Sequence, residues 1–451
     1  MANEFIALGG GGEIGASCYF YKLGKTNLLI DAGSRFSVPA FPDFTHLSAH
    51  IGSLAHLDAL LISHAHFDHI GALLRVQHDA PHVPKYATAP THALIDLMLQ
   101  DHIGIQARHQ RDGGAGSHSD LLGELLDSIQ IVAYNQTFSI AEDVQVTPLY
   151  AGHILGAAAF LIETPTQRIL HTGDYSLQSQ ALLHGATGLL AVDNIDLLVT
   201  ESTYLYQPDM ASLSAAQERQ SLLDSMDAVI QRGGRALIPA FSLGRAQEIA
   251  FTFKRAFLQG QIAPFPVLID GMAHSVAEVY NTWRDYFQIP QSDAHLIYNE
   301  WVRAADEDSR RADLLPPCCI IASSGMLLDG TRSAHYAAHL MPYAQDAIFF
   351  SGYLDEESPG ERLANLKTGD KFEVNGRSMA VHASVRRFKL SAHAQSRDIR
   401  RLIETIRPSQ VVTIHGDHRY APPADFIDFA MAQAATGTTI NHATNGKSFY
   451  F

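Results

Sequence analysis

Short apolar runs that end in polar, chemically reactive residues recur along the chain. Residues 1–35 alternate in a strand-like way, and a turn at 23–26 separates two extended runs, which predicts a β-hairpin. Later apolar runs, each short enough for one buried strand, cover residues 58–63, 144–149, 168–170 and 197–200. Each ends at or shortly before a histidine, aspartate or glutamate. The pattern therefore predicts strands whose ends hold candidate functional side chains.

The pattern changes from about residue 206, where strands begin to alternate with helices. Residues 236–240 and 266–270 are expected to be strands, and residues 245–258 between them a helix. Such alternation is typical of a parallel α/β unit.

Near residue 380 the first pattern returns, with apolar runs over 388–392 and 411–414 that again end in histidine. These changes in the pattern of apolar runs predict an α/β protein with domain boundaries after residues 205 and 379.

A glycine motif near the N-terminus is interpreted as a turn. Residues 10–15 match the G-x-G-x-x-G pattern of dinucleotide-binding folds, and Asp31 follows about twenty residues later, where such folds place an acidic residue. A dinucleotide site requires a helix directly after the glycines, whereas residues 17–31 have the pattern of a hairpin.

The composition is that of an ordinary globular protein. The 451 residues are 46% hydrophobic and 18% charged, which suits two or three domains with a core each. The 3 cysteines form no C-x-x-C pair, and neither a signal peptide nor an apolar run of about 18 residues is recognisable, so we expect a cytoplasmic protein that spans no membrane. The net charge of −15 argues against broad attraction to nucleic acid but leaves room for a local basic channel.

Histidine is abundant, with 24 residues, and three of them stand close together in the segment His64-x-His66-x-Asp68-His69. Side chains two residues apart in an extended backbone point the same way, so His64 and His66 can reach one ion. Asp68 and His69 can reach a second. Nitrogen and oxygen donors without thiolate suit zinc, with manganese or iron as alternatives. A surface histidine cluster is the competing interpretation.

Three later residues strengthen the metal interpretation. His153, Asp174 and His415 each follow an apolar run and adjoin a glycine. One histidine in such a place is more often a hydrogen-bonded loop residue, but several placements in one order are harder to explain that way. The series H-x-H-x-D-H, G-H and G-D resembles the metallo-β-lactamase superfamily, whose αββα sandwich holds a dinuclear metal site.

Downstream residues narrow the resemblance to one branch. Glu201, His393 and His415 are similar to motifs A, B and C of the β-CASP nucleases, which include bacterial ribonuclease J and the endonuclease subunit of the eukaryotic cleavage and polyadenylation factor. The resemblance implies that residues 1–205 and 380–451 form a metallo-β-lactamase domain. Residues 206–379 would then be an inserted parallel α/β β-CASP domain.

The resemblance also assigns metal ligands. It implies that His64, His66 and His153 hold one of two zinc ions, that Asp68, His69 and His415 hold the other, and that Asp174 bridges them. Asp31 resembles the family's first motif and would orient a ligand, with a strand-end turn residue as the alternative.

The catalytic candidates are Asp68, Glu201 and His393. An imidazole can donate a proton near neutral pH, so His393 is interpreted as the general acid and Glu201 as the residue that orients it, by chemistry and by resemblance.

Contacts with substrate phosphates are expected at three positions, Ser324, Gly325 and Ser391, with plain turn chemistry as an equal alternative. Basic side chains that can line an RNA path, or simply form a solvated face, are Arg332, Arg362, Arg386, Arg387 and Lys389.

One position departs from the family pattern. Gln395 stands where aspartate is common two residues after the motif B histidine, which puts the geometry around His393 in doubt.

The leading hypothesis is a zinc-dependent ribonuclease that cleaves single-stranded RNA, internally or from the 5′ end, and leaves 5′-phosphate and 3′-hydroxyl ends. The alternatives are a hydrolase of a small ester, lactone or thioester, a DNA-repair nuclease, and an inactive scaffold subunit for RNA processing. The sequence leaves open the cellular RNA and whether the chain forms a homo-oligomer or binds an RNA-processing partner.

Overall fold

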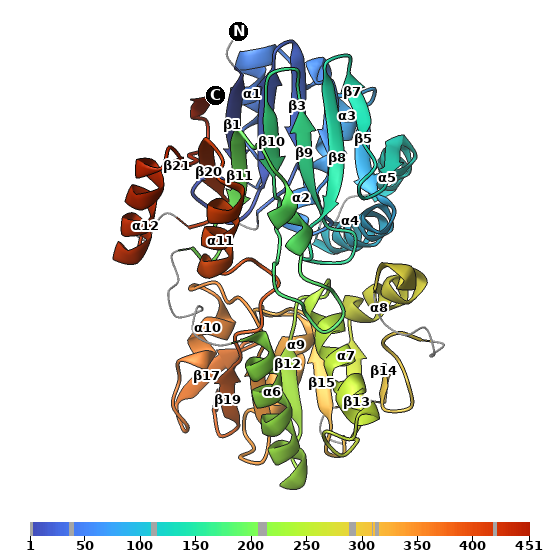
Figure 1. Cartoon of the computed structure of the whole chain (residues 1–451). Coiled ribbons are helices and arrows are strands. Elements are labelled where there is room, and N and C mark those ends of the chain that lie inside the picture. Colours follow the sequence, from blue (N-terminus) through green and yellow to red (C-terminus); the bar gives the residue numbers. More distant parts are fainter. Residues whose placement is uncertain are drawn as a thin grey trace. The chain divides into compact units, whose positions relative to one another are not determined.

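The computed structural model describes residues 3–35, 40–109, 115–205, 214–287, 295–308, 310–311, 315–417 and 422–451. The chain forms two compact units. The colours of Figure 1 run along the sequence from blue at the N-terminus to red at the C-terminus. The first unit comprises Met1–Ser179, Gly185–Ala211 and His393–Phe451, and the second comprises Gln180–His184 and Ser212–Ala392. The second unit is thus an insertion in the chain of the first.

Two seven-stranded sheets form the first unit. The strand order of the first sheet is β22-β1-β2-β3-β4-β5-β6, and its strands are β1 (Glu4–Gly9), β2 (Cys18–Leu23), β3 (Thr26–Ile30), β4 (Ala59–Leu61), β5 (Lys85–Thr88), β6 (Ile129–Val132) and β22 (Ser448–Tyr450). The order of the second sheet is β21-β20-β11-β10-β9-β8-β7, and its strands are β7 (Phe138–Ala141), β8 (Val144–Tyr150), β9 (Ala158–Glu163), β10 (Arg168–His171), β11 (Leu197–Glu201), β20 (Gln410–Ile414) and β21 (Thr439–His442). Buried side chains of both sheets, such as Phe5 and Tyr21 from the first and Phe160 from the second, share one core.

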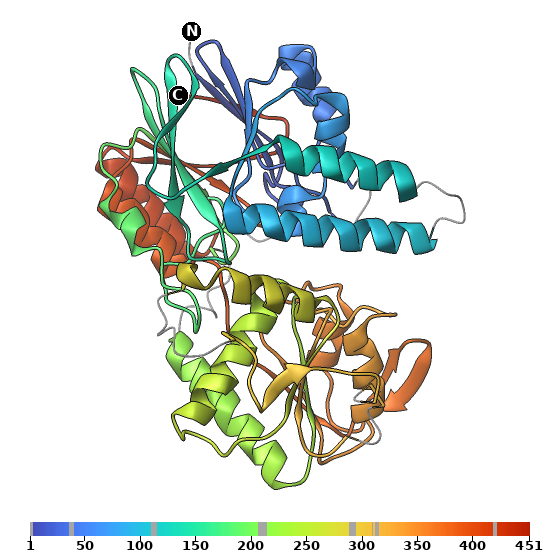
Figure 2. The same ribbon diagram turned by 90° about the vertical axis from the view of Figure 1, so that its right-hand side faces the viewer.

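Helices lie on the outer faces of this pair of sheets (Figure 2). They are α1 (Phe44–Ile51), α3 (Leu73–Asp79), α4 (Ala89–His109), α5 (Ala115–Ser128), α11 (Ser396–Ile406) and α12 (Ala424–Ala435). Helices α1 and α4 contact strands of the first sheet, and α12 contacts β21 of the second. The arrangement confirms the predicted αββα sandwich.

The predicted N-terminal hairpin is also confirmed, because β2 and β3 pair antiparallel with Tyr19 opposite Ile30. The glycine-rich loop after β1 leads into strand β2, so residues 10–15 lack the helix that a dinucleotide site requires. The carbonyl oxygen of Gly10 instead accepts a hydrogen bond from the backbone N–H of His415, at 2.7 Å. The loop therefore supports a candidate site residue directly.

The second unit is built on a sheet in which every neighbouring pair of strands is parallel. Its order is β14-β13-β15-β12-β16-β19, and its strands are β12 (Ala236–Pro239), β13 (Val267–Asp270), β14 (Val302–Ala304), β15 (Cys319–Ala322), β16 (Ala347–Phe350) and β19 (Ser384–Arg387). A separate hairpin is formed by β17 (Lys371–Val374) and β18 (Arg377–Ala380). This confirms the predicted parallel α/β unit.

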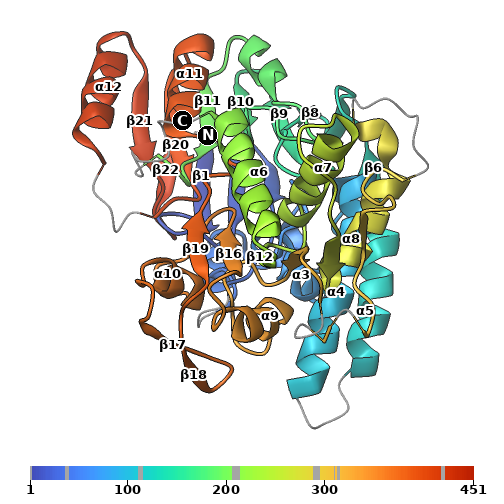
Figure 3. The same ribbon diagram turned by 90° about the horizontal axis from the view of Figure 1, so that it is seen from below.

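Helices cover both faces of this parallel sheet. They are α6 (Ala215–Gln231), α7 (Arg245–Leu258), α8 (Met272–Thr282), α9 (Arg332–Leu340) and α10 (Pro359–Ala364). Figure 3 shows α6 and α7 on one side of the sheet and α9 and α10 on the other. The helix predicted over residues 245–258 is confirmed as α7.

The domain boundaries stay predictions of the sequence. The first, after residue 205, borders residues 206–213, which lie outside the described residues. The second, after residue 379, precedes β19, a strand of the second unit's sheet. Among the helices of the described residues, none has the length and apolar character needed to cross a membrane.

Candidate metal centre

Strand ends in the first unit bring the predicted donors together. His64 follows β4, and short loops after β8, β10 and β20 hold His153, Asp174 and His415. Strands β10, β11 and β20 are parallel neighbours, and β8 runs in the same direction because β9 is antiparallel to both β8 and β10. Their carboxyl ends therefore meet at one edge of the second sheet.

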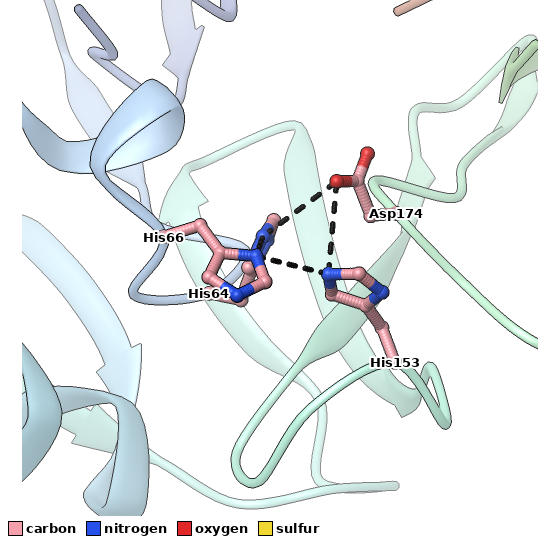
Figure 4. Close-up of side chains that lie close together, drawn as sticks. All are labelled: His64, His66, His153 and Asp174. Atoms are coloured by element: carbon pink, nitrogen blue, oxygen red, sulfur yellow. Dashed lines mark hydrogen bonds and ion pairs between the residues drawn. The ribbon is translucent and has the colours of Figure 1, made fainter. Parts of the chain in front are cut away.

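The first donor group consists of His64, His66, His153 and Asp174 (Figure 4). His66 Nδ1 lies 3.1 Å from both His64 Nε2 and His153 Nε2. Asp174 Oδ2 lies 3.6 Å from His64 Nε2 and 3.8 Å from His153 Nε2. A tetrahedral zinc ion with bonds of about 2.0–2.1 Å separates its donors by about 3.3–3.4 Å, so the spacing of these atoms suits such an ion.

The second donor group consists of Asp68, His69 and His415. Asp68 Oδ2 lies 3.2 Å from His415 Nε2 and 3.9 Å from His69 Nε2. Asp174 Oδ2 of the first group lies 3.3 Å from the same His69 nitrogen. One carboxylate oxygen thus borders both groups, as a bridging ligand must.

Two buried atoms at the junction of the groups fit the binding of a cation. His69 Nε2 and Asp174 Oδ1 make no hydrogen bond within the described residues, although both side chains are almost fully buried. Buried polar atoms are nearly always satisfied by a hydrogen bond or an ion. The donor set, nitrogen and oxygen without sulfur, fits zinc and also manganese or iron.

Burial and neighbouring charges set the protonation of the donors. Burial holds the pKa of His64 well below its usual value, which keeps this imidazole neutral and able to coordinate. Burial acts in the same direction on His69, but the carboxylates of Asp174, Asp31 and Asp68 outweigh it and raise the pKa of His69. In return, burial raises the pKa values of Asp68 and Asp174, but neighbouring imidazoles hold both below the usual range.

Asp31 and Ser63 orient two of the imidazoles. Asp31 is fully buried, and its Oδ2 accepts hydrogen bonds from His69 Nδ1 and Ser63 Oγ, both at 2.7 Å. Because the Ser63 hydroxyl donates to Asp31, it accepts from His64 Nδ1, at 3.0 Å. Nδ1 of both histidines is thereby engaged, so Nε2 is the ring nitrogen that faces the candidate metal position. This geometry supports the orienting role predicted for Asp31. Sequence reasoning missed Ser63, whose only signal is its place directly before His64.

Glu201 and His393 form a pair beside the donor groups. His393 Nδ1 donates to Glu201 Oε2 at 2.9 Å and lies 3.8 Å from Asp174 Oδ2. The other Glu201 oxygen accepts from the backbone N–H groups of Tyr175 and Ala394, at 2.8 and 3.3 Å. Both carboxylate oxygens of Glu201 are thus engaged, which suits an orienting residue better than a ligand.

The His393 imidazole is poised to carry a proton. Burial lowers its pKa, but the carboxylates of Glu201 and Asp174 outweigh burial and raise the pKa to about 9. The side chain keeps 18% of its surface exposed, whereas that of the neighbouring Asp174 keeps 2%. The arrangement therefore presents a protonated, reachable imidazole next to the candidate metal centre.

Thr203 connects this pair to the second donor group. Its hydroxyl donates to Glu201 Oε2 at 2.7 Å, so it accepts from His415 Nδ1 at 2.9 Å, which leaves His415 Nε2 for coordination. Sequence reasoning missed Thr203. The available signal was its place two residues after Glu201, on the same side of an extended segment.

Gln395, the departure from the family pattern, lies at the start of α11. Gln395 precedes α11 and forms an isolated parallel bridge with Tyr204. Its backbone N–H donates to Asp398 Oδ2 at 3.3 Å, and Gln178 Nε2 donates to the same oxygen at 2.9 Å. A buried carboxylate is therefore present one helical turn later, on Asp398.

The predicted phosphate contacts lie in the second unit. Ser324 follows β15, and its hydroxyl accepts from the backbone N–H of Leu328 at 3.1 Å, which is turn chemistry. At Gly325 an added Cβ would lie 3.0 Å from the backbone nitrogen of Phe241, so the chain there packs against the end of β12. Ser391 lies beyond β19, close to the return to the first unit. Their role in binding phosphate stays a prediction.

Three family models match consecutive parts of the chain. A metallo-β-lactamase superfamily domain matches residues 21–205, a β-CASP domain matches residues 246–363, and a Zn-dependent metallo-hydrolase RNA specificity domain matches residues 378–422.

Curated relatives agree with these matches. Transcription termination factor FttA of Methanothermobacter thermautotrophicus is 30% identical over 92% of this chain and 67% of its own length. Integrator complex subunit 11 of Gallus gallus is 29% identical over 91% of this chain and 68% of its length. Endoribonuclease ysh1 of Schizosaccharomyces pombe is 28% identical over 92% of this chain and 54% of its length.

The chain thus spans about two thirds or less of the length of these curated relatives. Within that span the family models cover every predicted metal donor and most of the inserted parallel unit. The chain belongs to the β-CASP branch of the metallo-β-lactamase superfamily.

Proposed function

We propose that this chain is a ribonuclease that hydrolyses phosphodiester bonds of single-stranded RNA with the help of two zinc ions. The observation that carries the proposal is the place of Asp174 Oδ2, which borders both donor groups and lies 3.8 Å from the imidazole of His393. The two proposed ion positions and the proposed proton donor, His393, would thus lie next to the same carboxylate. Two-metal hydrolysis of a phosphodiester uses the ions to activate water and neutralise charge, and it also requires a proton for the leaving oxygen.

The residues of the chain divide the work. His64, His66 and His153 would hold one ion, Asp68, His69 and His415 the other, and Asp174 both. When bound, such ions lower the pKa of a water molecule and neutralise charge on the phosphate oxygens.

His393 donates its proton to the departing 3′ oxygen, and Glu201 holds the imidazole in place and protonated. Water adds to phosphorus and the bond to the 3′ oxygen breaks, so the products carry a 5′-phosphate and a 3′-hydroxyl.

The names of relatives support RNA as the substrate. The Schizosaccharomyces pombe relative is called an endoribonuclease, and the third family model is described as an RNA specificity domain. The histidine of motif C, His415, also favours RNA over DNA by resemblance.

The presence of every predicted donor argues against an inactive scaffold subunit, which would be expected to lose ligands. The cytoplasmic location and the choice between internal and 5′-end cleavage stay part of the proposal.

The test uses end-labelled and circular single-stranded RNA, with DNA of the same sequence beside them. We expect cleavage of RNA that stops on chelation and returns with zinc, with 5′-phosphate ends on the products. Cleavage of the circle would establish internal action, and its absence would leave action from the 5′ end.

Asp174→Asn serves as the matched inactive control, because it keeps the size of the side chain and removes the bridging charge. Equal cleavage of DNA would refute the proposed preference for RNA. Products with 2′,3′-cyclic phosphate ends would refute the proposed attack of water on phosphorus.

A further inference from the structure

A pair of arginines in the second unit is held by one buried carboxylate. Asp270, the last residue of β13, is 1% exposed. Its Oδ1 accepts from Arg310 Nε and Nη2, at 3.2 and 3.1 Å, and its Oδ2 lies 3.9 Å from Arg332 Nε. Tyr336 Oη and the backbone N–H of Gly271 donate to the same carboxylate, at 2.9 and 2.7 Å.

The carboxylate is buried while the guanidinium groups reach solvent. The Arg310 and Arg332 side chains are 39% and 48% exposed. The cluster of Asp270, Arg310 and Arg332 carries one negative and two positive charges, and Glu307 lies near enough to act on Arg310. Because Asp270 already restrains both arginines, less side-chain entropy is lost when they bind an anion.

The cluster lies where parallel sheets place their ligands. The chain after β12 enters α7 on one face of the sheet, and the chain after β15 enters α9 on the other (Figure 3). The carboxyl ends of such strands border the binding crevice of open α/β sheets. Asp270 ends the strand next to β15, and the helices α8 and α9 both begin at this edge, with their positive ends toward it.

Gly271 allows the parts of this cluster to approach. Its φ is +81°, and an added Cβ would lie 2.7 Å from Ser323 Oγ and 3.6 Å from Arg332 Cγ. The glycine thus leaves the Ser323 hydroxyl beside the arginine pair. A hydroxyl and two guanidinium groups are donors that match the oxygens of a phosphate.

We propose that Arg310 and Arg332, anchored by Asp270, bind phosphates of the RNA strand at the carboxyl edge of the second unit's sheet. This rests on the proposed function. The net charge of −15 makes a localised basic site the means by which this chain attracts a polyanion. The donors address the backbone, so the site holds the strand without reading its sequence.

The test measures how RNA binding depends on salt. A fluorescent single-stranded RNA is titrated at several KCl concentrations, in a His393→Ala background that is expected to keep its ions without cleaving. Each phosphate contact on a single strand contributes about −0.7 to the slope of log K against log salt. Replacing both arginines by glutamine, as R310Q/R332Q, should reduce the slope by about 1.4 and weaken binding at least about tenfold at low salt.

Two controls separate the site from general charge and from folding. Arg75→Gln removes an arginine of α3 whose side chain is 52% exposed, in the first unit, and should leave the slope unchanged. R310K/R332K keeps both charges without the planar fork and should restore the slope but not the full affinity. In every variant Asp270 retains the hydrogen bonds from Tyr336 and Gly271, and the thermal midpoint checks the fold.

If a folded R310Q/R332Q variant showed an unchanged salt dependence of RNA binding, the proposed arginine site would be wrong. RNA cleavage by the wild type would still support the proposed function in that case. Equal slope losses in Arg75→Gln would also overturn the arginine site, because the effect would then be general charge. Failure of the wild type both to bind and to cleave RNA would overturn the two proposals together.

Discussion

The metal centre of the first unit and the arginine pair of the second occupy the same kind of place, the carboxyl ends of parallel strands, but they differ in burial. His64, Asp174 and His415 are at most 3% exposed, whereas the Arg310 and Arg332 side chains are 39% and 48% exposed. A small ion needs donors fixed on all sides, and a long polyanion needs charges that it can reach. The contrast teaches that a shared topology positions a site while burial selects its ligand.

Carboxylates have opposite roles in the two regions. In the metal centre Asp174 is a candidate ligand, and neighbouring imidazoles hold its pKa low despite burial. In the second unit Asp270 is not proposed to contact a ligand. It instead anchors Arg310 and Arg332, the cations proposed to bind phosphate. Four substitutions test this division, in order of expected effect.

Asp174→Ala should have the largest effect. Without the carboxylate, two cations would face each other with no shared negative charge between them. We expect the metal content to fall from two ions per chain to one or none, and cleavage to fall to the level of the chelated wild type. Elemental analysis and a cleavage assay on the same preparation measure both. If the variant kept two ions per chain, Asp174 could not be the bridging ligand.

His393→Ala should lose activity without losing metal. A positioned general acid is typically worth about 10²–10⁴ in rate. His393 lies within reach of Asp174, Glu201 and His415, but it belongs to neither of the two predicted ion sets. Elemental analysis separates this variant from Asp174→Ala. Loss of an ion here would mean that His393 is a ligand, and the assignment of His415 would need revision.

Thr203→Val should have a smaller effect, about 10–100-fold, on zinc affinity at the second donor group or on rate. Valine keeps the shape but removes the hydroxyl that accepts from His415 Nδ1. Thr203→Ser retains the hydroxyl and should restore both quantities, measured by competition with a zinc chelator and by turnover. If serine failed to rescue, the methyl packing of Thr203 would be the important feature.

Gly271→Ala should have the smallest effect on function, a weaker binding of RNA. Alanine at a positive φ costs about 1–3 kcal/mol, and here its Cβ also meets Ser323 Oγ. Gly330→Ala is the matched control, because Gly330 has a φ of +76° and open space around the added Cβ. Both should lose stability in thermal unfolding, Gly271→Ala more than Gly330→Ala because of the contact with Ser323 Oγ, and only Gly271→Ala should bind RNA more weakly. Equal binding by the two would separate Gly271 from the arginine site.

The sequence predicted the candidate donors best where a histidine or aspartate follows a predicted strand. His64, His153, Asp174 and His415 could be found because each follows a short apolar run, and the structure brings them together. The parallel second unit could be predicted for the same reason, since strands and helices alternate there with clear periodicity.

The residues that escaped prediction act through partners distant in sequence. Thr203 matters because of His415, and its place beside that residue depends on the pairing of β11 with β20. Arg332 was recognised only as one basic residue among several, and Arg310 was missed, because their common anchor Asp270 has no distinguishing pattern. Polar contacts across the fold leave no periodic trace along the chain, so only the structure reveals them.

The pairing of β11 with β20 also orders events during synthesis. These strands are neighbours in the second sheet, with Glu201 opposite Ile414, yet the whole inserted unit lies between them in the chain. A nascent chain that has emerged only as far as β11 holds His64, His66, His153 and Asp174 but still lacks His393 and His415. All residues of the first donor group have then been made, whereas the second group still lacks His415. The candidate site can therefore be completed only after the whole inserted unit has been synthesised.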